Sequence, residues 1–473
     1  MLSHSANGWW KGDFWEHIAV VRELSTHPNS PLHPRFLLSA PHEFFSPYAV
    51  AAAWIIRTLG TSPVVTLAGL GIFNLALFFG SFRLFCTLLF GNRAVPFYAL
   101  LFTLLLWGIT PWEYSGFYHL GALGYVLPYP STFAMALLFL VLSLQILQLR
   151  SGNFLYLALL SPLVPLVLLV HPMTALVMGL WMLVLPINRC TSRLAAHYSV
   201  LAGVFTMAVL VSAVWPWFPF MSLILDKAAV FHEGNQPIYS ELIKRVFPAL
   251  FGVPLVLCRI RANWKDPLGL MFLGLCLIYT YGGVTGMWTY GRVISHVVLV
   301  LHLVIADWIT RQGPALRTAP IWTGRVLRLA IADLLLVSCL NFLPVFGRSI
   351  LGSERGYMEY GFLSTHTQQY DVILSDIHTS WIVPAFGGKV VASHHPQGFV
   401  EDYMARRQDL ETFFSAHGSH GERLAIIDKY KVHFLLVNED EVTLSPEMER
   451  SFGDFGETVY HEGKLRLIRV SAQ

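Results

Sequence analysis

The sequence predicts a mainly α-helical membrane protein: a polytopic transmembrane helical bundle of about ten spans, followed by a C-terminal soluble α/β domain. Three observations predict it. The 473 residues are 55% hydrophobic and only 13% charged, which is too apolar for an ordinary soluble domain. Apolar stretches long enough to cross a bilayer recur along the chain. After about Phe346 the composition changes, and most of the acidic residues lie in that final stretch.

Ten apolar stretches are predicted as spanning helices, because a span needs about 20 mainly apolar residues. They lie at about 63–90, 95–110, 130–149, 154–170, 173–187, 195–218, 246–258, 267–284, 293–310 and 327–346. The two that meet at His171 and Pro172 are short, so a single re-entrant hairpin is the alternative there. The predicted domains are residues 1–48, an extracytoplasmic acidic loop with interfacial helices; 49–346, the transmembrane helical domain; and 347–473, an extracytoplasmic soluble α/β domain.

The arginines and lysines predict the orientation, since short cytoplasmic loops carry an excess of both. With the N-terminus outside, the basic residues gather in turns assigned to the cytoplasm. These residues are Arg93, Arg150, Arg189, Arg193, Arg259, Arg261, Lys265, Arg311, Arg317 and Arg325. Residues 111–129 carry none, although the outside loop near 219–245 holds three. We therefore expect a multi-pass protein of the plasma or inner membrane, with its C-terminal domain extracytoplasmic.

The soluble domain shows alternating strand-like and helical segments. VILSD, KVVAS and HFLLVNED are strand-like, RRQDLETFFS and ERLAIIDKY are helical, and TVYHEG-KLRLIRV is typical of a closing hairpin. No Gly-rich phosphate loop and no nucleophile elbow occurs in it. We expect this domain to have no catalytic centre of its own.

Net charge and cysteine spacing exclude several functions. The net charge is only +3 and no long basic run appears, so nucleic acid is not an expected partner. The five cysteines form no CxxC pair and no zinc-type spacing, and are predicted to be small buried apolar residues.

Polar residues suited to chemistry gather in the first 48 residues. Asp13, Glu16 and His17 have the i, i+3, i+4 spacing of one helical face, and His42 and Glu43 lie in the segment PHEFFSPY. A carboxylate held there, at the membrane surface, could act as a general base. The alternative is a solvated loop that only tethers helices.

Four features occur together in this chain. They are the acidic motif GDFWEH, the Pro-Tyr helix SPYAVAAAWIIRTLG, the following span ending in the basic turn FRLFCTLLFGNR, and a soluble domain after the last span. With these features the chain resembles the GT-C superfamily of membrane glycosyltransferases, in particular the branch of protein mannosyltransferases and aminoarabinose transferases. Members normally have a spanning helix before the acidic loop, so we expect that this sequence lacks its first transmembrane helix.

The resemblance implies sugar transfer from a polyprenyl-phosphate-linked donor to a glycan, lipid or protein acceptor at the outer face of the membrane. Asp13 matches the family's catalytic carboxylate. Glu16, His17, His42 and Glu43 are further candidates on the catalytic or acceptor side.

A departing lipid phosphate needs a cation, and Arg292 in the loop MWTYGRVISH is the best candidate, because guanidinium geometry suits phosphate oxygens. Tyr290 could line the same donor pocket. The alternative for Arg292 is an arginine that extends from lipid to the interface. We expect Asp13 and Arg292 to face one cavity.

The sequence singles out no set of metal ligands and leaves the cofactor unknown. Some members of the superfamily use a divalent metal and others do not, and His42 and Glu43 are residue types that could ligate one.

Two other functions stay open. A transporter or flippase of a lipid-linked or polar substrate would place ionisable groups at mid-membrane, whereas Arg83, Asp307 and Asp333 fall near predicted helix ends. The other is a non-catalytic envelope assembly protein whose soluble domain binds partners.

Overall fold

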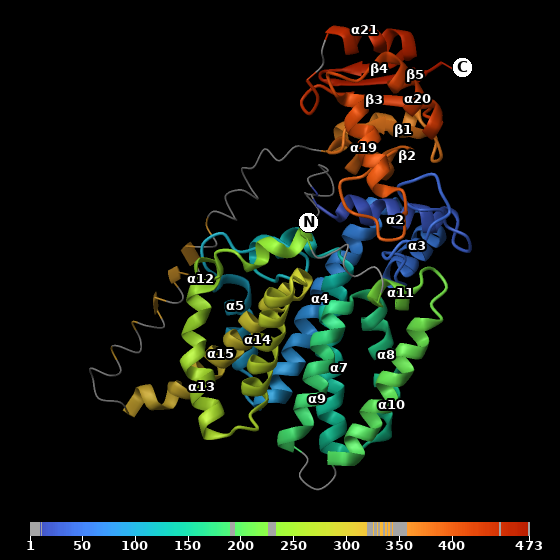
Figure 1. Cartoon of the computed structure of the whole chain (residues 1–473). Helices are drawn as coiled ribbons and strands as arrows, with labels where there is room; N and C mark the ends of the chain where they lie inside the picture. The colour runs from blue at the N-terminus through green and yellow to red at the C-terminus, as the bar shows by residue number, and fades with distance from the viewer. Residues whose placement is uncertain are drawn as a thin grey trace. The chain divides into compact units, whose positions relative to one another are not determined.

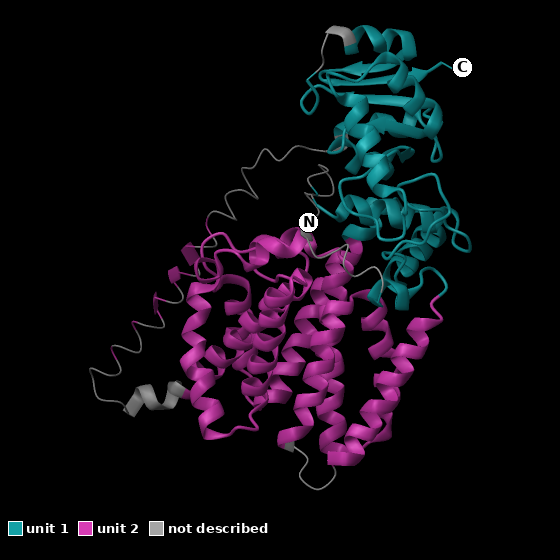
Figure 2. Ribbon diagram, in the orientation of Figure 1, with its two compact units in different colours: residues 1–68, 216–230, 354–473 teal, residues 69–215, 231–353 magenta. Residues whose placement is uncertain are grey.

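The computed structural model describes residues 10, 12–189, 194–225, 233–318, 357–443 and 446–471, with scattered residues between 325 and 343. It divides the chain into two compact units (Figures 1 and 2). Unit 1 comprises Met1–Ala68, Pro216–Val230 and Glu354–Gln473, and unit 2 comprises Gly69–Trp215 and Phe231–Ser353. The ends of the chain therefore belong to the same unit.

Unit 2 is built from helices. Helix α4 (Pro63–Phe90) starts in the last residues of unit 1 and continues into it. The others are α5 (Val95–Leu105), α6 (Leu120–Val126), α7 (Pro130–Ser151), α8 (Phe154–Val170), α9 (Pro172–Arg189), α10 (Leu194–Ala213), η2 (Glu233–Tyr239), α12 (Leu242–Val246), η3 (Phe247–Phe251), α13 (Gly252–Ala262), α14 (Pro267–Thr285), η4 (Trp288–Val293) and α15 (Ile294–Thr318).

These helices make the chain a polytopic membrane protein. Among the described residues, five helical stretches are long and apolar enough to cross a bilayer: α4, α7, α10, α14 and the stretch formed by η4 and most of α15. Helices α5, α8 and α9 are shorter apolar helices. The predicted spans coincide with these elements to within a few residues at most ends, and η3 and α13 occupy the predicted span 246–258. The predicted span 327–346 lies largely outside the described residues.

Charges inside the bundle are paired at a helix end. Asp307 of α15 is buried, and its two carboxylate oxygens accept from Arg259 at 2.6 Å and from Arg311 at 2.9 Å. Arg259 also binds Asp266, the N-cap of α14, at 2.7 Å. The cluster joins the α13–α14 turn, at the lower end of unit 2 in Figure 1, to α15. It is an ion-pair network that fixes three helices, which is the opposite of an unpaired mid-membrane charge on a transport path.

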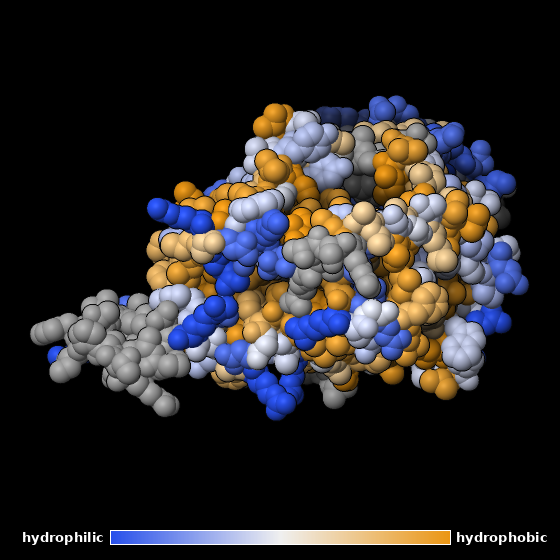
Figure 3. Space-filling model, turned by 90° about the horizontal axis from the view of Figure 1, so that it is seen from below, coloured by the Kyte–Doolittle hydropathy of each residue, from blue (hydrophilic) through white to orange (hydrophobic). Residues whose placement is uncertain are grey.

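Hydrophilic groups are visible from the same end. Viewed from below (Figure 3), hydrophilic side chains lie among hydrophobic ones. The α13–α14 turn there carries Arg259, Arg261 and Lys265, which were predicted to be cytoplasmic. Which side of the membrane this end faces stays a prediction.

Unit 1 begins with two helices that the sequence predicted. Helix α2 (Phe14–Thr26) follows Asp13, and α3 (Pro47–Leu59) follows the N-cap Ser46, whose hydroxyl accepts from the backbone of Ala49. Gly60, at φ +64°, ends α3 in the left-handed conformation that glycine adopts without strain. The short Pro-Tyr helix that was predicted before the long span is confirmed, while its position at the membrane interface stays a prediction.

The C-terminal part of unit 1 is an α/β fold around a five-stranded sheet of order β2-β1-β3-β5-β4. Strands β2, β1 and β3 are parallel, and β5 and β4 close the sheet as an antiparallel hairpin. The strands are β1 (Val372–Ser375), β2 (Lys389–Val390), β3 (Phe434–Asn438), β4 (Gly456–Glu462) and β5 (Leu465–Val470). All three predicted strands and the closing hairpin are confirmed.

Helices pack around this sheet. They are η5 (Tyr357–Phe362), α17 (Leu363–His366), η6 (Thr379–Trp381), α18 (Val383–Phe386), α19 (Tyr403–Phe414), α20 (His420–Tyr430) and α21 (Pro446–Phe455). Helix α11 (Phe220–Leu225), from the middle of the chain, also belongs to unit 1. Phe413 of α19, Leu435 of β3 and Met448 of α21 are buried in one apolar core. The two helices predicted in this domain are confirmed as α19 and α20.

Buried polar contacts hold the first loop against the C-terminal domain. Lys389 Nζ donates to Glu23 Oε2 at 2.7 Å and to the backbone oxygen of His33 at 2.9 Å, and both charged side chains are at most 2% exposed. The backbone N–H of Val390 donates to the carbonyl of Arg35 at 2.7 Å. Arg22 donates to two carbonyls near α18. Residues at opposite ends of the sequence therefore form one folded unit.

We expect Lys389→Met to destabilise unit 1 by about 3–5 kcal/mol, because it leaves the Glu23 carboxylate buried without its cation. The measurement is thermal unfolding of the detergent-solubilised protein, with proteolysis of the C-terminal domain as the probe. Lys429→Met is the matched control, because its pair with Asp409 lies at the surface and should be worth no more than about 1 kcal/mol. Equal effects of the two substitutions would contradict the prediction.

Candidate active site

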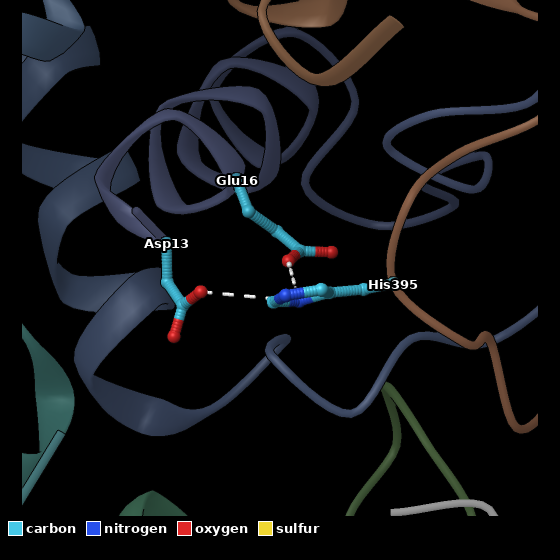
Figure 4. Close-up of side chains that lie close together, drawn as sticks. All are labelled: Asp13, Glu16 and His395. Carbon is cyan, nitrogen blue, oxygen red and sulfur yellow. Dashed lines mark ion pairs between the residues drawn. The ribbon is translucent and has the colours of Figure 1, made fainter. Parts of the chain in front are cut away.

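Helix α2 presents two carboxylates of different exposure in its first turn. Asp13 occupies the N-cap position but makes no side-chain capping hydrogen bond, and its side chain is 31% exposed. Glu16, one turn on, is 2% exposed. Figure 4 shows both side chains directed to the same imidazole, that of His395. The predicted shared face of Asp13 and Glu16 is therefore present.

Glu16 is an ionised carboxylate in a buried polar pocket. Its Oε1 accepts from Arg35 Nε at 2.9 Å and from Gln397 Nε2 at 3.4 Å, and lies 3.5 Å from His42 Nε2. Burial alone would raise the pKa of Glu16, but Arg35, helped by His395 and His42, holds it well below its usual range. The negative charge of Glu16 is therefore balanced by the polar and charged groups around it.

His395 stands between the two carboxylates. Its Nδ1 lies 3.5 Å from Glu16 Oε2 and 3.8 Å from Asp13 Oδ1, and its side chain is 42% exposed (Figure 4). Burial opposes a charge on the ring, but Glu16 and Asp13 outweigh it and raise the pKa of His395. Asp13 and His395 are therefore the accessible groups of the cluster, and Glu16 lies beneath them.

The sheet explains why His395 reaches this place. His394 and His395 follow β2, and His378 and Trp381 follow β1, at the carboxyl ends of neighbouring parallel strands. Side chains beyond these ends share one edge of a sheet, where open α/β folds bind ligands. The Trp381 ring packs edge-on against His395 at 4.3 Å. The C-terminal domain thus supplies one wall of the site.

Trp381 also fastens this wall to the first loop. Its indole N–H donates to the carbonyl of Gly12 at 3.0 Å, and the Arg35 guanidinium lies 4.3 Å from the centre of its ring. Sequence analysis missed His395, Arg35, Gln397 and Trp381, because no local spacing connects them to α2.

The other predicted residues of the first loop are close by but differ in environment. His17 is buried and stacks on Phe44 at 4.9 Å, and burial lowers its pKa to about 4. His42 is fully buried, and its Nδ1 accepts from the backbone of Phe44. Burial raises the pKa of Glu43. His17 and His42 are thus packed, supporting side chains.

Arg292 and Tyr290 lie in unit 2, in η4. Arg292 Nε donates to Asn235 at 2.7 Å, and Nη1 to the carbonyl of Ser115 at 3.5 Å. Its guanidinium thus lies among polar groups of other segments of unit 2. Tyr290 packs instead against Tyr281 of α14, with ring centres 5.8 Å apart. The expectation that Asp13 and Arg292 face one cavity stays a prediction.

Asp13, Glu16 and His395 are also the residues that could hold a metal ion. One ligand atom from each lies within 4.8 Å of the other two. The sequence had singled out no metal ligands and had noted only His42 and Glu43, so this grouping is visible in the structure alone.

No family model and no curated protein matches the chain. Several solved structures share its fold. The oligosaccharyltransferase of Archaeoglobus fulgidus, tethered with an acceptor peptide containing the NVT sequon, is 11% identical with a TM-score of 0.56, over 90% of this chain and 64% of its own. ArnT from Cupriavidus metallidurans, bound to undecaprenyl phosphate, is 11% identical with a TM-score of 0.56, over 99% and 96%.

The chain has the GT-C glycosyltransferase fold. The fold expected from the four sequence features is therefore confirmed. The chain spans just under two thirds of the oligosaccharyltransferase and nearly all of ArnT. At 11% identity the GT-C fold establishes the arrangement of the elements, and the roles of residues rest on the geometry above.

We expect this protein to lose stability as the pH falls below about 6.5, in part through His33. His33 Nδ1 accepts from the backbone N–H groups of Arg35 and Phe36, and Nε2 contacts Gln397 Oε1 at 3.1 Å. The ring is neutral in the fold, and burial holds its pKa well below 6.5. The His33 ring therefore binds a proton near pH 6.5 in the unfolded chain but stays neutral at that pH in the folded chain.

The measurement is the melting temperature between pH 7.5 and 5. His33→Asn keeps an acceptor near the Nδ1 position but cannot titrate, so its melting temperature should fall less steeply with pH. Burial also lowers the pKa of His17, so His17 contributes to the same loss of stability at low pH. Part of the pH dependence should therefore remain in His33→Asn. His417→Asn, at an exposed site, is the control. An unchanged slope in His33→Asn would show that His33 does not contribute.

Proposed function

We propose that this chain is an integral membrane glycosyltransferase that transfers a sugar from a polyprenyl-phosphate-linked donor to an acceptor at the outer face of the membrane. The GT-C fold supports the class of reaction. The observation that carries the proposal is the partly exposed Asp13 carboxylate at the start of α2, held beside His395 and next to the buried Glu16. The reaction needs an accessible base at this kind of position.

Exposure and charge favour Asp13 over Glu16 as the base. Glu16 is sealed from solvent and its charge is balanced by Arg35, so an acceptor hydroxyl could not reach it without breaking that pair. Asp13 is accessible, and its carboxylate takes no part in capping α2. In this proposal Glu16, Arg35 and His395 position Asp13.

The proposed step balances as a displacement at the anomeric carbon. The acceptor oxygen forms the new bond to that carbon while Asp13 takes the acceptor proton, a contribution of about 10²–10⁴ in rate for a general base. The bond from the carbon to the phosphate oxygen breaks, and the electron pair leaves with the polyprenyl phosphate. Arg292 is proposed to stabilise the departing phosphate, because a guanidinium matches its oxygens.

Two parts of the proposal concern location. The donor is membrane-soluble, and the multi-pass helices of unit 2 provide a lipid-facing surface for a polyprenyl chain. We place the acidic loop and the C-terminal domain on the extracytoplasmic side of the plasma or inner membrane, from the distribution of arginines and lysines along the sequence.

Asp13→Asn should abolish transfer, with donor binding largely kept, because the amide has the same shape but accepts no proton. The measurement is transfer of labelled sugar by the protein in liposomes, after a panel of polyprenyl-phosphate sugars has identified the donor. Asp402→Asn, at an exposed carboxylate of the same unit, is the control. Full turnover in Asp13→Asn would show that Asp13 is not the general base.

Arg292→Ala should weaken donor binding by about 1.5–3 kcal/mol, the loss expected for one hydrogen bond to a charged group. That corresponds to a KM for the donor raised by roughly 10–150-fold. Arg245→Ala is the matched control, since Arg245 is another arginine of unit 2 that binds loop carbonyl and aromatic groups. A donor KM in Arg292→Ala equal to that of the wild type would show that Arg292 does not bind the donor phosphate.

A further inference from the structure

We propose that a polar cavity of the C-terminal domain binds a saccharide unit of the acceptor, so that the acceptor is a glycan. The inference rests on the proposed function, but its test measures sugar binding and does not require transfer. The cavity has a volume of about 360 Å³ and is lined by residues of η5, the end of β3 and the β4–β5 hairpin. This volume is at the lower end of the range for small-molecule sites, roughly 300–1,000 Å³.

The topology of the sheet favours a ligand site at this place. In the order β2-β1-β3, the chain leaves β1 for its neighbour β2 and then crosses to the other side of β1 to form β3. The strand order therefore reverses between β1 and β3, and open α/β sheets bind ligands beyond the carboxyl ends of their strands at such a point. Asn438, the last residue of β3, stands at that edge and lines the cavity.

Hydrogen bonds hold this wall of the cavity in place. Asn438 is 5% exposed, and its Nδ2 donates to the Tyr360 hydroxyl and to Thr379 Oγ1, both at 3.2 Å. Its Oδ1 accepts from the backbone N–H of Asp440 at 3.1 Å. Thr379 follows β1, so these bonds join the ends of β1 and β3. The wall is set before a ligand arrives, which lowers the cost of binding.

Asp376 adds an independent observation behind the same wall. It follows β1 directly, is 7% exposed, and accepts through Oδ1 from the backbone N–H of Thr379 at 2.9 Å. Its Oδ2 is buried and makes no hydrogen bond with any residue that the structure describes. A buried carboxylate oxygen of this kind is costly unless a donor satisfies it. This edge of the sheet therefore has more acceptors than donors, and hydroxyl groups are donors that a ligand can bring.

The lining has the chemistry that a sugar needs. Carboxylate oxygens accept hydrogen bonds from hydroxyl groups, and those of Glu359, Asp440 and Glu462 line the cavity. The partly exposed Tyr460 ring offers an apolar surface for the C–H face of a sugar ring. Phe362 stacks on Tyr460 with ring centres 3.8 Å apart, and the Tyr460 hydroxyl donates to Glu462 at 2.7 Å. The aromatic ring and the carboxylate are therefore fixed relative to each other.

The charge of the lining disfavours other small ligands. Lys464 is the one cation among the lining residues, all of which the structure describes, and it is paired with Asp440. The two remaining carboxylates give the cavity a net negative charge, which repels phosphates, nucleotides and acidic sugars. A metal ion is not indicated either, because these carboxylates form no metal-sized group among the described residues. A neutral or amine-bearing sugar is the ligand that fits.

The cavity lies along the same edge of the sheet as one wall of the candidate active site. His395 follows β2, and β2 and β3 are separated by two strand spacings, about 10 Å. A glycan of several units spans such a distance. One unit held in the cavity would therefore keep the acceptor chain on the edge that leads to His395 and Asp13.

The experiment measures binding of free sugars to the full-length protein in lipid nanodiscs by saturation-transfer NMR. The probes are the methyl glycosides of glucose, mannose, galactose and glucosamine, with glucuronic acid as an acidic probe and trilysine as a basic peptide. We expect at least one neutral or amino sugar to bind. Glucuronic acid and trilysine should not bind, because the first is repelled and the second offers no hydroxyl groups.

Glu462→Gln should weaken binding of that sugar by at least about 10-fold, the loss expected for one hydrogen bond to a charged group. Tyr460→Leu, which removes the aromatic surface, should weaken it as well. Glu462 is exposed, so its substitution should leave the melting temperature unchanged. Glu457→Gln is the matched control, since Glu457 is an exposed carboxylate of the same strand that does not line the cavity.

Three results would overturn the inference. Absence of sugar binding in the wild type would leave the cavity without this ligand, equal binding in the wild type and both variants would place the sugar elsewhere, and binding of trilysine alone would indicate a basic peptide. Sugar binding by a protein that transfers nothing would count against the proposed function alone. Transfer at an unchanged acceptor KM in Glu462→Gln and Tyr460→Leu would remove the cavity from acceptor binding and leave the proposed function intact.

Discussion

Burial of charge on one face of α2 is the constraint on which unit 1 depends. Glu16 and Glu23 lie two turns apart, and each is too buried to be ionised without a cation. Arg35, from the same loop, forms an ion pair with Glu16, whereas Lys389, 366 residues away from Glu23, forms an ion pair with Glu23. The local pair shapes the loop around α2, and the distant pair brings the C-terminal domain to it. The edge of the sheet and its histidines are positioned as a result.

This arrangement gives different surroundings to two carboxylates that the sequence places on one helical face. Glu16 gains neighbours that fix its charge and orientation, and loses access to solvent. Asp13 keeps access, because the N-cap position lies at the rim of the buried face. A reactive group held in place by inert neighbours is a common way to build a precise site, since the geometry is then set before a substrate arrives. The fold of the first loop therefore encloses one of two acids one turn apart and leaves the other accessible.

Local patterns made much of this fold predictable. The length of the apolar stretches located the helices of unit 2, and short strand-like segments located β1, β3 and the closing hairpin. Spacing placed Asp13 and Glu16 together. Contacts between distant segments were not predictable: Gln397 meets Glu16 across 381 residues, and Lys389 looks like an ordinary strand residue until its burial is known. The missed α21 is a short helix that begins at a proline in a polar stretch, and only Met448, Phe452 and Phe455 mark its apolar face.

The pairing of Glu23 with Lys389 also sets an order of assembly. The ribosome delivers α2 early and β2 near the end of synthesis, so the loop waits through the insertion of the intervening helices with one buried-site carboxylate unmatched. Contacts of such long sequence separation form late and slowly. The folding of unit 1 is therefore completed only after Lys389 has been synthesised, however early α2 leaves the ribosome.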